Sequence, residues 1–83
     1  MTAKEMFEKL GYEQEEMYNC IYYNKGQKCI EIWLNAKEIQ CNEYIKEDEH
    51  YIPADITFEE LQAINKQVEE LGWLGDKEWM IML

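Results

Sequence analysis

The longest regular pattern of apolar and polar positions lies between Ile56 and Trp73, where apolar residues recur every three or four positions. This spacing predicts an amphipathic helix of about four turns. Thr57 is a helix N-cap and Glu60 completes a capping box, while Gly72 suits the left-handed residue that ends a helix. The side chains expected to face the core are Phe58, Leu61, Ile64, Val68 and Leu71.

A second, shorter helix is predicted at the N-terminus by the same signals. Thr2 and Glu5 form another capping box, and Gly11 ends the apolar pattern. Its apolar stripe consists of Ala3, Met6, Phe7 and Leu10.

Between the two helices, alternation of apolar and polar residues predicts three β-strands. They span Met17–Tyr23, Lys28–Leu34 and Ile39–Tyr44. Glu13–Glu16 is interpreted as a polar connector, and residues 43–60 as an acidic segment that leads into the long helix. Turns centred on Lys25-Gly26 and Ala36-Lys37 predict the cross-strand pairs Ile21 with Ile30, Leu34 with Ile39, and Ile32 with Cys41.

This register predicts a sheet with two different faces. The apolar face, expected to form the floor under the long helix, consists of Ile21, Tyr23, Ile30, Ile32, Leu34, Ile39 and Cys41. The opposite face mixes aromatic and polar groups, namely Tyr18, Cys20, Tyr22, Cys29, Glu31, Trp33, Asn42 and Tyr44. Either the N-terminal helix or the C-terminal tail covers this second face, or it is an open binding surface.

The predicted fold class is therefore α+β, in a single small domain over residues 1–83. An N-terminal helix precedes a three-stranded antiparallel meander, and the long C-terminal amphipathic helix packs on one sheet face. The short apolar tail after Trp73 is expected to add a strand or to form an oligomer contact. No apolar run approaches the roughly 20 residues of a membrane span, and the N-terminus predicts a helix rather than a signal peptide. A cytoplasmic protein is expected.

Composition narrows the chemistry further. The chain has no arginine and no serine, so a serine nucleophile and clamping of phosphate by guanidinium groups are excluded. Eighteen acids against eight lysines give a net charge of −10, which disfavours direct binding to nucleic acid. Residues 1–42 hold five lysines and seven acids, and residues 43–83 hold three lysines and eleven acids, so the second half carries −8.

No pattern of residues predicts a catalytic, cofactor or metal site. The three cysteines, Cys20, Cys29 and Cys41, are odd in number and without C-x-x-C spacing, which indicates free thiols in a reducing compartment. With His50 they match no compact zinc-ligand spacing. A disulfide between Cys20 and Cys29 is geometrically conceivable in the predicted sheet, and His50 is expected to be a solvated loop histidine. The protein is expected not to be an enzyme.

Two features favour an interaction surface. Glu69 and Glu70 lie in the last turn of the long helix, where negative charge opposes the helix dipole. Tyrosine and tryptophan on the second sheet face are residue types that anchor protein interfaces. With the acidic run before His50, the candidate interaction residues are Glu69, Glu70, Glu47, Asp48, Glu49, Trp33, Tyr18, Tyr22 and Tyr44.

Two segments, Met1–Tyr12 and Leu61–Trp73, resemble small uncharacterised proteins from phages and mobile elements of low-G+C Gram-positive bacteria. They bracket the chain as far as Trp73, and the tail after it departs from that pattern. The resemblance implies no assigned activity, so no functional residues follow from it. In size and charge, an acidic phage protein is similar to host-defence inhibitors that mimic nucleic acid.

The expected function is that of a non-catalytic acidic interaction protein, encoded by a phage, that binds a host protein. The partner is expected to be basic or nucleic-acid-binding, with the chain acting as a nucleic-acid mimic; no cofactor and no membrane are expected. The alternative is a small structural or oligomerising accessory protein. Its homodimer contact would be the tail residues Trp79, Met80, Ile81, Met82 and Leu83.

Overall fold

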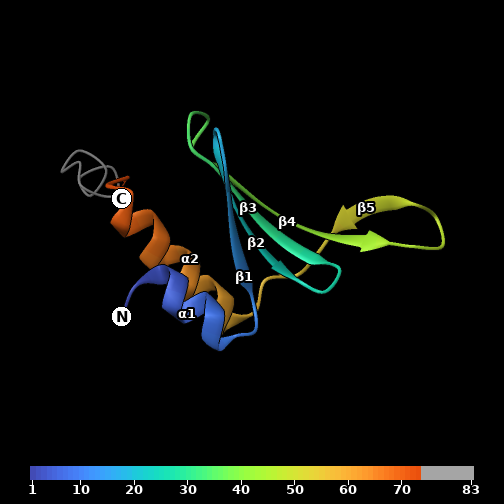
Figure 1. The fold of residues 1–83 in the computed structure, drawn as a ribbon, viewed down its shortest axis with the longest axis horizontal. Helices are drawn as coiled ribbons and strands as arrows, with labels where there is room; N and C mark the ends of the chain where they lie inside the picture. The colour runs from blue at the N-terminus through green and yellow to red at the C-terminus, as the bar shows by residue number, and fades with distance from the viewer. Residues whose placement is uncertain (74–83) are drawn as a thin grey trace.

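A computed structural model describes residues 1–73 as a five-stranded antiparallel sheet with two helices (Figure 1). In chain order the elements are α1 (Ala3–Lys9), β1 (Glu13–Met17), β2 (Cys20–Lys25), β3 (Lys28–Trp33), β4 (Glu38–Ile45), β5 (His50–Pro53) and α2 (Phe58–Glu70). The strands lie side by side in the same order as in the sequence. Both predicted capping boxes are present, at Thr2 with Glu5 and at Thr57 with Glu60.

The expected three-stranded meander is wrong, because the sheet has two further strands. The segment interpreted as a polar connector is β1, and the acidic segment contains β5. Both are edge strands, and most of their side chains are exposed. Neither therefore shows the apolar alternation by which the three inner strands were recognised, and charged residues are typical of exposed edges.

The register also differs from the expected one by two residues at both turns. Ile32 lies opposite Ile21 on β2 and opposite Ile39 on β4. The β2–β3 turn is the two-residue loop Gly26-Gln27, in which Gly26 has a φ of 59° that glycine adopts without strain. A shift of two residues leaves each side chain on its predicted face. The division of the inner strands into two faces is thus confirmed, although the partners are not.

Both helices lie on one side of the sheet, and the core is between them and that face (Figure 1). The ring of Phe7 on α1 stacks on that of Tyr23 with centroids 3.8 Å apart, and Tyr12 meets Phe7 edge-on at 5.7 Å. The buried cluster comprises Phe7, Tyr12, Ile21, Tyr23, Ile30, Ile32, Ala63 and Ile64. Leu34, Ile39, Cys41, Val68 and Leu71 pack against it and are partly buried.

The buried face of α2 is rotated from the predicted stripe. Phe58 and Leu61 are 69% and 45% exposed, whereas Glu60 and Gln67 are buried. These two polar side chains tolerate burial because each accepts a hydrogen bond from a tyrosine hydroxyl of the core, Glu60 from Tyr12 and Gln67 from Tyr23. The prediction was wrong for Phe58 and Leu61 because a pattern of apolar residues cannot identify a polar residue that is buried with hydrogen-bond partners.

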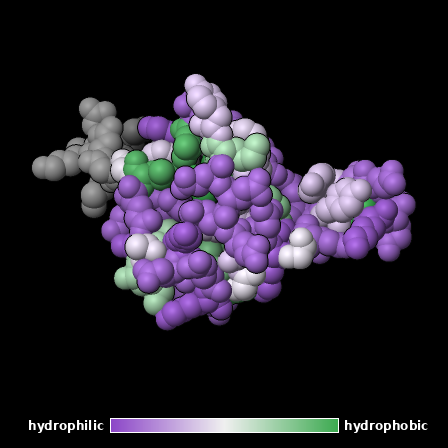
Figure 2. Space-filling view, viewed as in Figure 1, coloured by the Kyte–Doolittle hydropathy of each residue, from purple (hydrophilic) through white to green (hydrophobic). Residues whose placement is uncertain are grey.

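The β4–β5 hairpin projects from the body of the molecule and accounts for its elongated shape, 46 Å by 27 Å by 25 Å (Figure 1). Every residue from 46 to 53 is exposed. The surface of this hairpin is mostly hydrophilic (Figure 2). No helix within residues 1–73 has the length and apolar character needed to cross a membrane.

Candidate interaction surface

The face of the sheet opposite the helices, here called the open face, is not covered by α1 or α2. This corrects the expectation that the N-terminal helix covers it, because α1 packs beside α2 against the apolar face. The register sets Glu15, Tyr22, Glu31 and Gln40 in one row across β1 to β4. Met17, Cys20, Trp33 and Glu38 form the next row.

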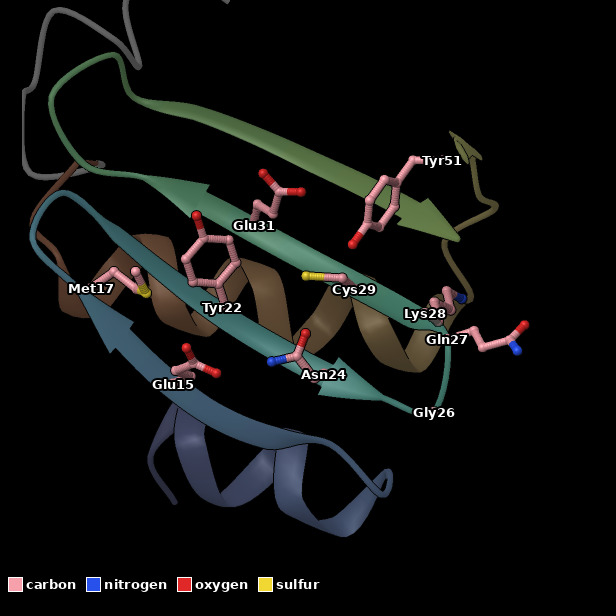
Figure 3. Close-up of a pocket in the computed structure, with 10 residues that line it drawn as sticks. All are labelled: Glu15, Met17, Tyr22, Asn24, Gly26, Gln27, Lys28, Cys29, Glu31 and Tyr51. Carbon is pink, nitrogen blue, oxygen red and sulfur yellow. The ribbon is translucent and has the colours of Figure 1, made fainter. Parts of the chain in front are cut away.

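A shallow pocket of about 270 Å³ occupies the middle of the open face (Figure 3). It is lined by side chains from β1, β2, β3 and β5, among them Glu15, Tyr22, Cys29 and Tyr51. Because Glu15 on the first strand and Tyr51 on the fifth border the same pocket, the open face is hollowed rather than flat. Figure 3 shows the Tyr51 side chain extending over the sheet from one side and Tyr22 lying on the other.

Hydrogen bonds and an aromatic contact connect Glu31 with the side chains around it. The indole Nε1 of Trp33 donates to one carboxylate oxygen of Glu31 at 3.1 Å, and the Asn42 amide donates to the other at 3.3 Å. Trp33 also meets the ring of Tyr22 edge-on, with centroids 6.2 Å apart. These two hydrogen bonds hold the Glu31 carboxylate in one orientation on the open face.

The charged residues at the strand positions of the open face are all acidic. These positions carry four carboxylates, Glu13, Glu15, Glu31 and Glu38, and no lysine. The two strand lysines, Lys25 and Lys28, lie on the helix side. Lys28 forms an ion pair with Glu60 at 2.8 Å, and the Lys25 ammonium lies 5.7 Å from the centre of the Tyr12 ring. Aromatic rings and carboxylates are thus separated by the sheet from the nearest strand lysines.

Two titratable side chains of the pocket, Cys29 and Tyr22, have raised pKa values. Burial, with a smaller contribution from the charge of Glu31, raises the pKa of the Cys29 thiol to about 11. Burial also raises the pKa of the Tyr22 hydroxyl, with Cys20 as a second cause. A thiol with a raised pKa stays protonated at neutral pH and is a poor nucleophile. Both groups are neutral hydrogen-bonding surface in this pocket.

Four of the predicted interaction residues are aromatic and fall on or beside the open face. Tyr22 and Trp33 lie near its centre. Tyr44 lies opposite Tyr51 in the β4–β5 hairpin, one pair away from its last pair before the turn, with ring centroids 5.2 Å apart. Tyr18, in the β1–β2 turn, is fully exposed. Sequence reasoning missed Glu15 and Tyr51 because it missed the strands that carry them.

The acidic run predicted as an interaction site lies at the tip of the projecting hairpin. Glu47, Asp48 and Glu49 occupy the turn between β4 and β5, and all three are exposed. His50 is exposed beside them, with its Nδ1 3.3 Å from the backbone oxygen of Asp48. The hairpin thus extends the negative open face beyond the helices.

Glu69 and Glu70 are not part of this surface. A carboxylate oxygen of Glu70 accepts a hydrogen bond from the backbone N–H of Ala3 at 2.9 Å, so Glu70 sits at the N-terminus of α1. Negative charge is favourable at that end of a helix. Glu69 lies 3.6 Å from Lys66 in an ion pair. The charges that oppose the dipole of α2 therefore have partners within the fold.

The cysteines are free thiols. Cys20 lies opposite Trp33 and Cys29 lies opposite Asn24, so the register does not place the two cysteines opposite each other for a disulfide. Among residues 1–73, no group of three or more histidine, cysteine or acidic side chains is placed to hold a metal ion. The tail residues predicted as a homodimer contact or extra strand, Trp79 to Leu83, lie outside the described residues.

No protein-family model, curated protein or solved structure matched the chain. Inference about its function therefore rests on the arrangement of its own residues. The feature that needs a functional explanation is the open face, because aromatic side chains there lie uncovered by either helix.

Proposed function

We propose that this chain is a non-catalytic interaction protein that binds a basic protein through the open face and the acidic tip of the adjoining hairpin. The observation that carries the proposal is the separation of side chains by the sheet. Aromatic rings and four carboxylates share the open face, and the strand lysines lie on the other. Tyrosine and tryptophan are enriched at the centres of interfaces, and negative potential attracts a positively charged partner.

The net charge of −10 supports a basic partner and opposes association with another acidic surface. A protein that normally binds nucleic acid has such a basic surface, so mimicry of nucleic acid is the sharpest version of this proposal. The acidic tip of the hairpin, Glu47 to Glu49, extends the negative surface in the manner of a row of phosphates. The resemblance to phage proteins favours a host protein as the partner.

The test compares two charge-reversal variants that differ in the face they alter. Glu15→Lys with Glu38→Lys changes the open face, on β1 and β4, at two exposed positions. Glu16→Lys with Glu43→Lys changes exposed positions of the same two strands on the other face. Both variants alter the net charge equally, so any difference in binding between them reports where on the protein the charge was changed.

Each variant is used as immobilised bait in a host lysate at low and high salt, with melting curves as a check on folding. We expect the open-face variant to lose a basic protein that the wild type and the control variant retain, and high salt to release it from both. Equal loss with both variants would contradict the proposal, because net charge alone would then explain the capture.

A further inference from the structure

We infer that the pocket on the open face receives an arginine side chain of the partner, with its guanidinium group beside the Tyr22 ring and between Glu15 and Glu31. This inference rests on the proposed function and specifies what that surface recognises. The pocket lies at the centre of the row in which Glu15, Tyr22 and Glu31 are cross-strand neighbours. A cation that enters the pocket from this face has the Tyr22 ring beside it and a carboxylate on each side of the ring.

The orientation of the Glu31 carboxylate suits a planar group that has two parallel N–H donors. The two carboxylate oxygens each accept one hydrogen bond, from Trp33 and from Asn42, and these bonds fix the plane of the carboxylate. Each carboxylate oxygen can accept a further bond, so both remain open to a second donor. A guanidinium group supplies two parallel N–H donors that match the two oxygens of a carboxylate, which an ammonium group does not.

The walls of the pocket suit the flat faces of the same group. The rings of Tyr22 and Tyr51 border the pocket from different strands, and an arginine side chain stacks on aromatic rings more readily than lysine does (Figure 3). The Cys29 thiol and the Asn24 amide in the lining are uncharged. Lys28 also lines the pocket, but its ammonium group is paired with Glu60 on the helix side at 2.8 Å, so its charge is offset there. The lining therefore combines the carboxylates of Glu15 and Glu31 with aromatic and uncharged polar groups.

The size of the pocket agrees with a single side chain. Its volume of about 270 Å³ is below the roughly 300–1,000 Å³ of pockets that enclose drug-sized ligands. The pocket is only partly enclosed, so the backbone that carries the arginine remains outside it. The occupant that fits this shape and charge is an arginine projecting from a basic segment of a protein.

Two synthetic peptides test the inference with the full-length chain. They are identical in length and net charge, and one carries arginine where the other carries lysine. Titration of each into the isotope-labelled protein is followed by the amide signals of β2 and β3 and by the indole signal of Trp33. We expect the arginine peptide to bind about three- to five-fold more tightly, and to shift the Trp33 indole signal through Glu31.

Four variants identify the side chains that bind the arginine peptide. Glu15→Gln with Glu31→Gln keeps the shape of the pocket and removes its charge, while Glu16→Gln with Glu43→Gln is the matched control on the other face. Tyr22→Leu removes the ring, and Tyr22→Phe retains it without the hydroxyl. We expect the first variant to bind both peptides weakly, Tyr22→Leu to lose the preference for arginine, and Tyr22→Phe to keep it.

The outcomes distinguish this inference from the broader proposal. Equal affinity for the two peptides, with loss of binding only in the Glu15 and Glu31 variant, would overturn the arginine site and leave the open face as the binding surface. Equal weakening by both double variants would overturn the two together. A preference for arginine that Tyr22→Leu leaves unchanged would show that the guanidinium group binds elsewhere.

Discussion

Glu60 links local helix capping with the tertiary fold. Its carboxylate accepts hydrogen bonds from the backbone of Thr57, the hydroxyl of Tyr12 and the ammonium group of Lys28. The sequence predicts the first of these from the capping box, but it contains no signal for the other two, because Tyr12 and Lys28 are distant along the chain. Burial alone raises the pKa of Glu60, and the three donors together outweigh it and lower the pKa to about 2.

The lowered pKa makes a signed prediction for stability against pH. The charged form of Glu60 is favoured in the folded state, so its contribution is complete above the ordinary pKa of 4.5 and is lost as pH falls towards about 2. We expect Glu60→Gln to lower the free energy of unfolding by about 1–3 kcal/mol at pH 7, from lost hydrogen bonds at a buried site.

The measurement is denaturant unfolding of wild type and variant at several pH values, with Glu59→Gln as the exposed control. The difference between wild type and Glu60→Gln should shrink as pH falls below 4.5. A difference that stays constant to pH 3 would contradict the assignment.

Glu70 is placed unfavourably in its own helix but favourably with respect to α1. Its position opposes the dipole of α2, which favours an interpretation as a functional site, but it accepts a hydrogen bond from Ala3 at the start of α1. We therefore expect Glu70→Gln to destabilise the protein by about 0.3–1 kcal/mol, because glutamine keeps an acceptor oxygen for the Ala3 N–H but loses the negative charge that favours the N-terminus of α1. Glu69→Gln is the matched control, and its free energy of unfolding should change by less than about 0.5 kcal/mol. Stabilisation by Glu70→Gln would show that the dipole of α2 dominates.

Among the secondary-structure elements, those that pack their own apolar residues into the core could be predicted from sequence. Both helices and the three inner strands have the required periodicity or alternation. The faces of the inner strands are as predicted, whereas the buried face of α2 takes in Glu60 and Gln67 in place of Phe58 and Leu61. The edge strands β1 and β5 have no buried face to produce such a pattern, so they were missed. For the same reason the sequence identified Tyr22 and Trp33 on the open face but gave no pocket, since that depends on Glu15 and Tyr51.

A substitution of Ile32 tests how the strands of the sheet pack into the core. Ile32 is fully buried and lies between Ile21 and Ile39 on the neighbouring strands. Ile32→Ala should lower the free energy of unfolding by about 2–5 kcal/mol, which is typical of truncation in a core. Ile52→Ala, on the projecting hairpin, makes the same chemical change at a site that is 37% exposed and should cost much less. Equal losses in denaturant unfolding would contradict the placement of the core.

For the whole molecule, we propose that one face of the sheet provides stability and the other face recognition. One face packs on the helices and forms the core, while the other presents aromatic rings and carboxylates outside it. Substitutions on the open face should therefore change binding more than stability. Association with the basic partner should weaken steeply with salt, since the attraction acts between exposed charges that counter-ions screen. Binding that is insensitive to salt would show that charge does not guide the encounter.

The most direct test of the open face is to map the bound partner onto the isotope-labelled chain by changes in its amide signals. We predict that the changes concentrate on the open-face residues of the sheet, including Tyr22, Trp33 and Tyr44, and continue into the hairpin tip. The exposed side of α2 around Phe58 and Leu61 should remain unchanged. Changes confined to α2, or to the tail residues 79–83, would contradict the assignment of the open face as the binding surface.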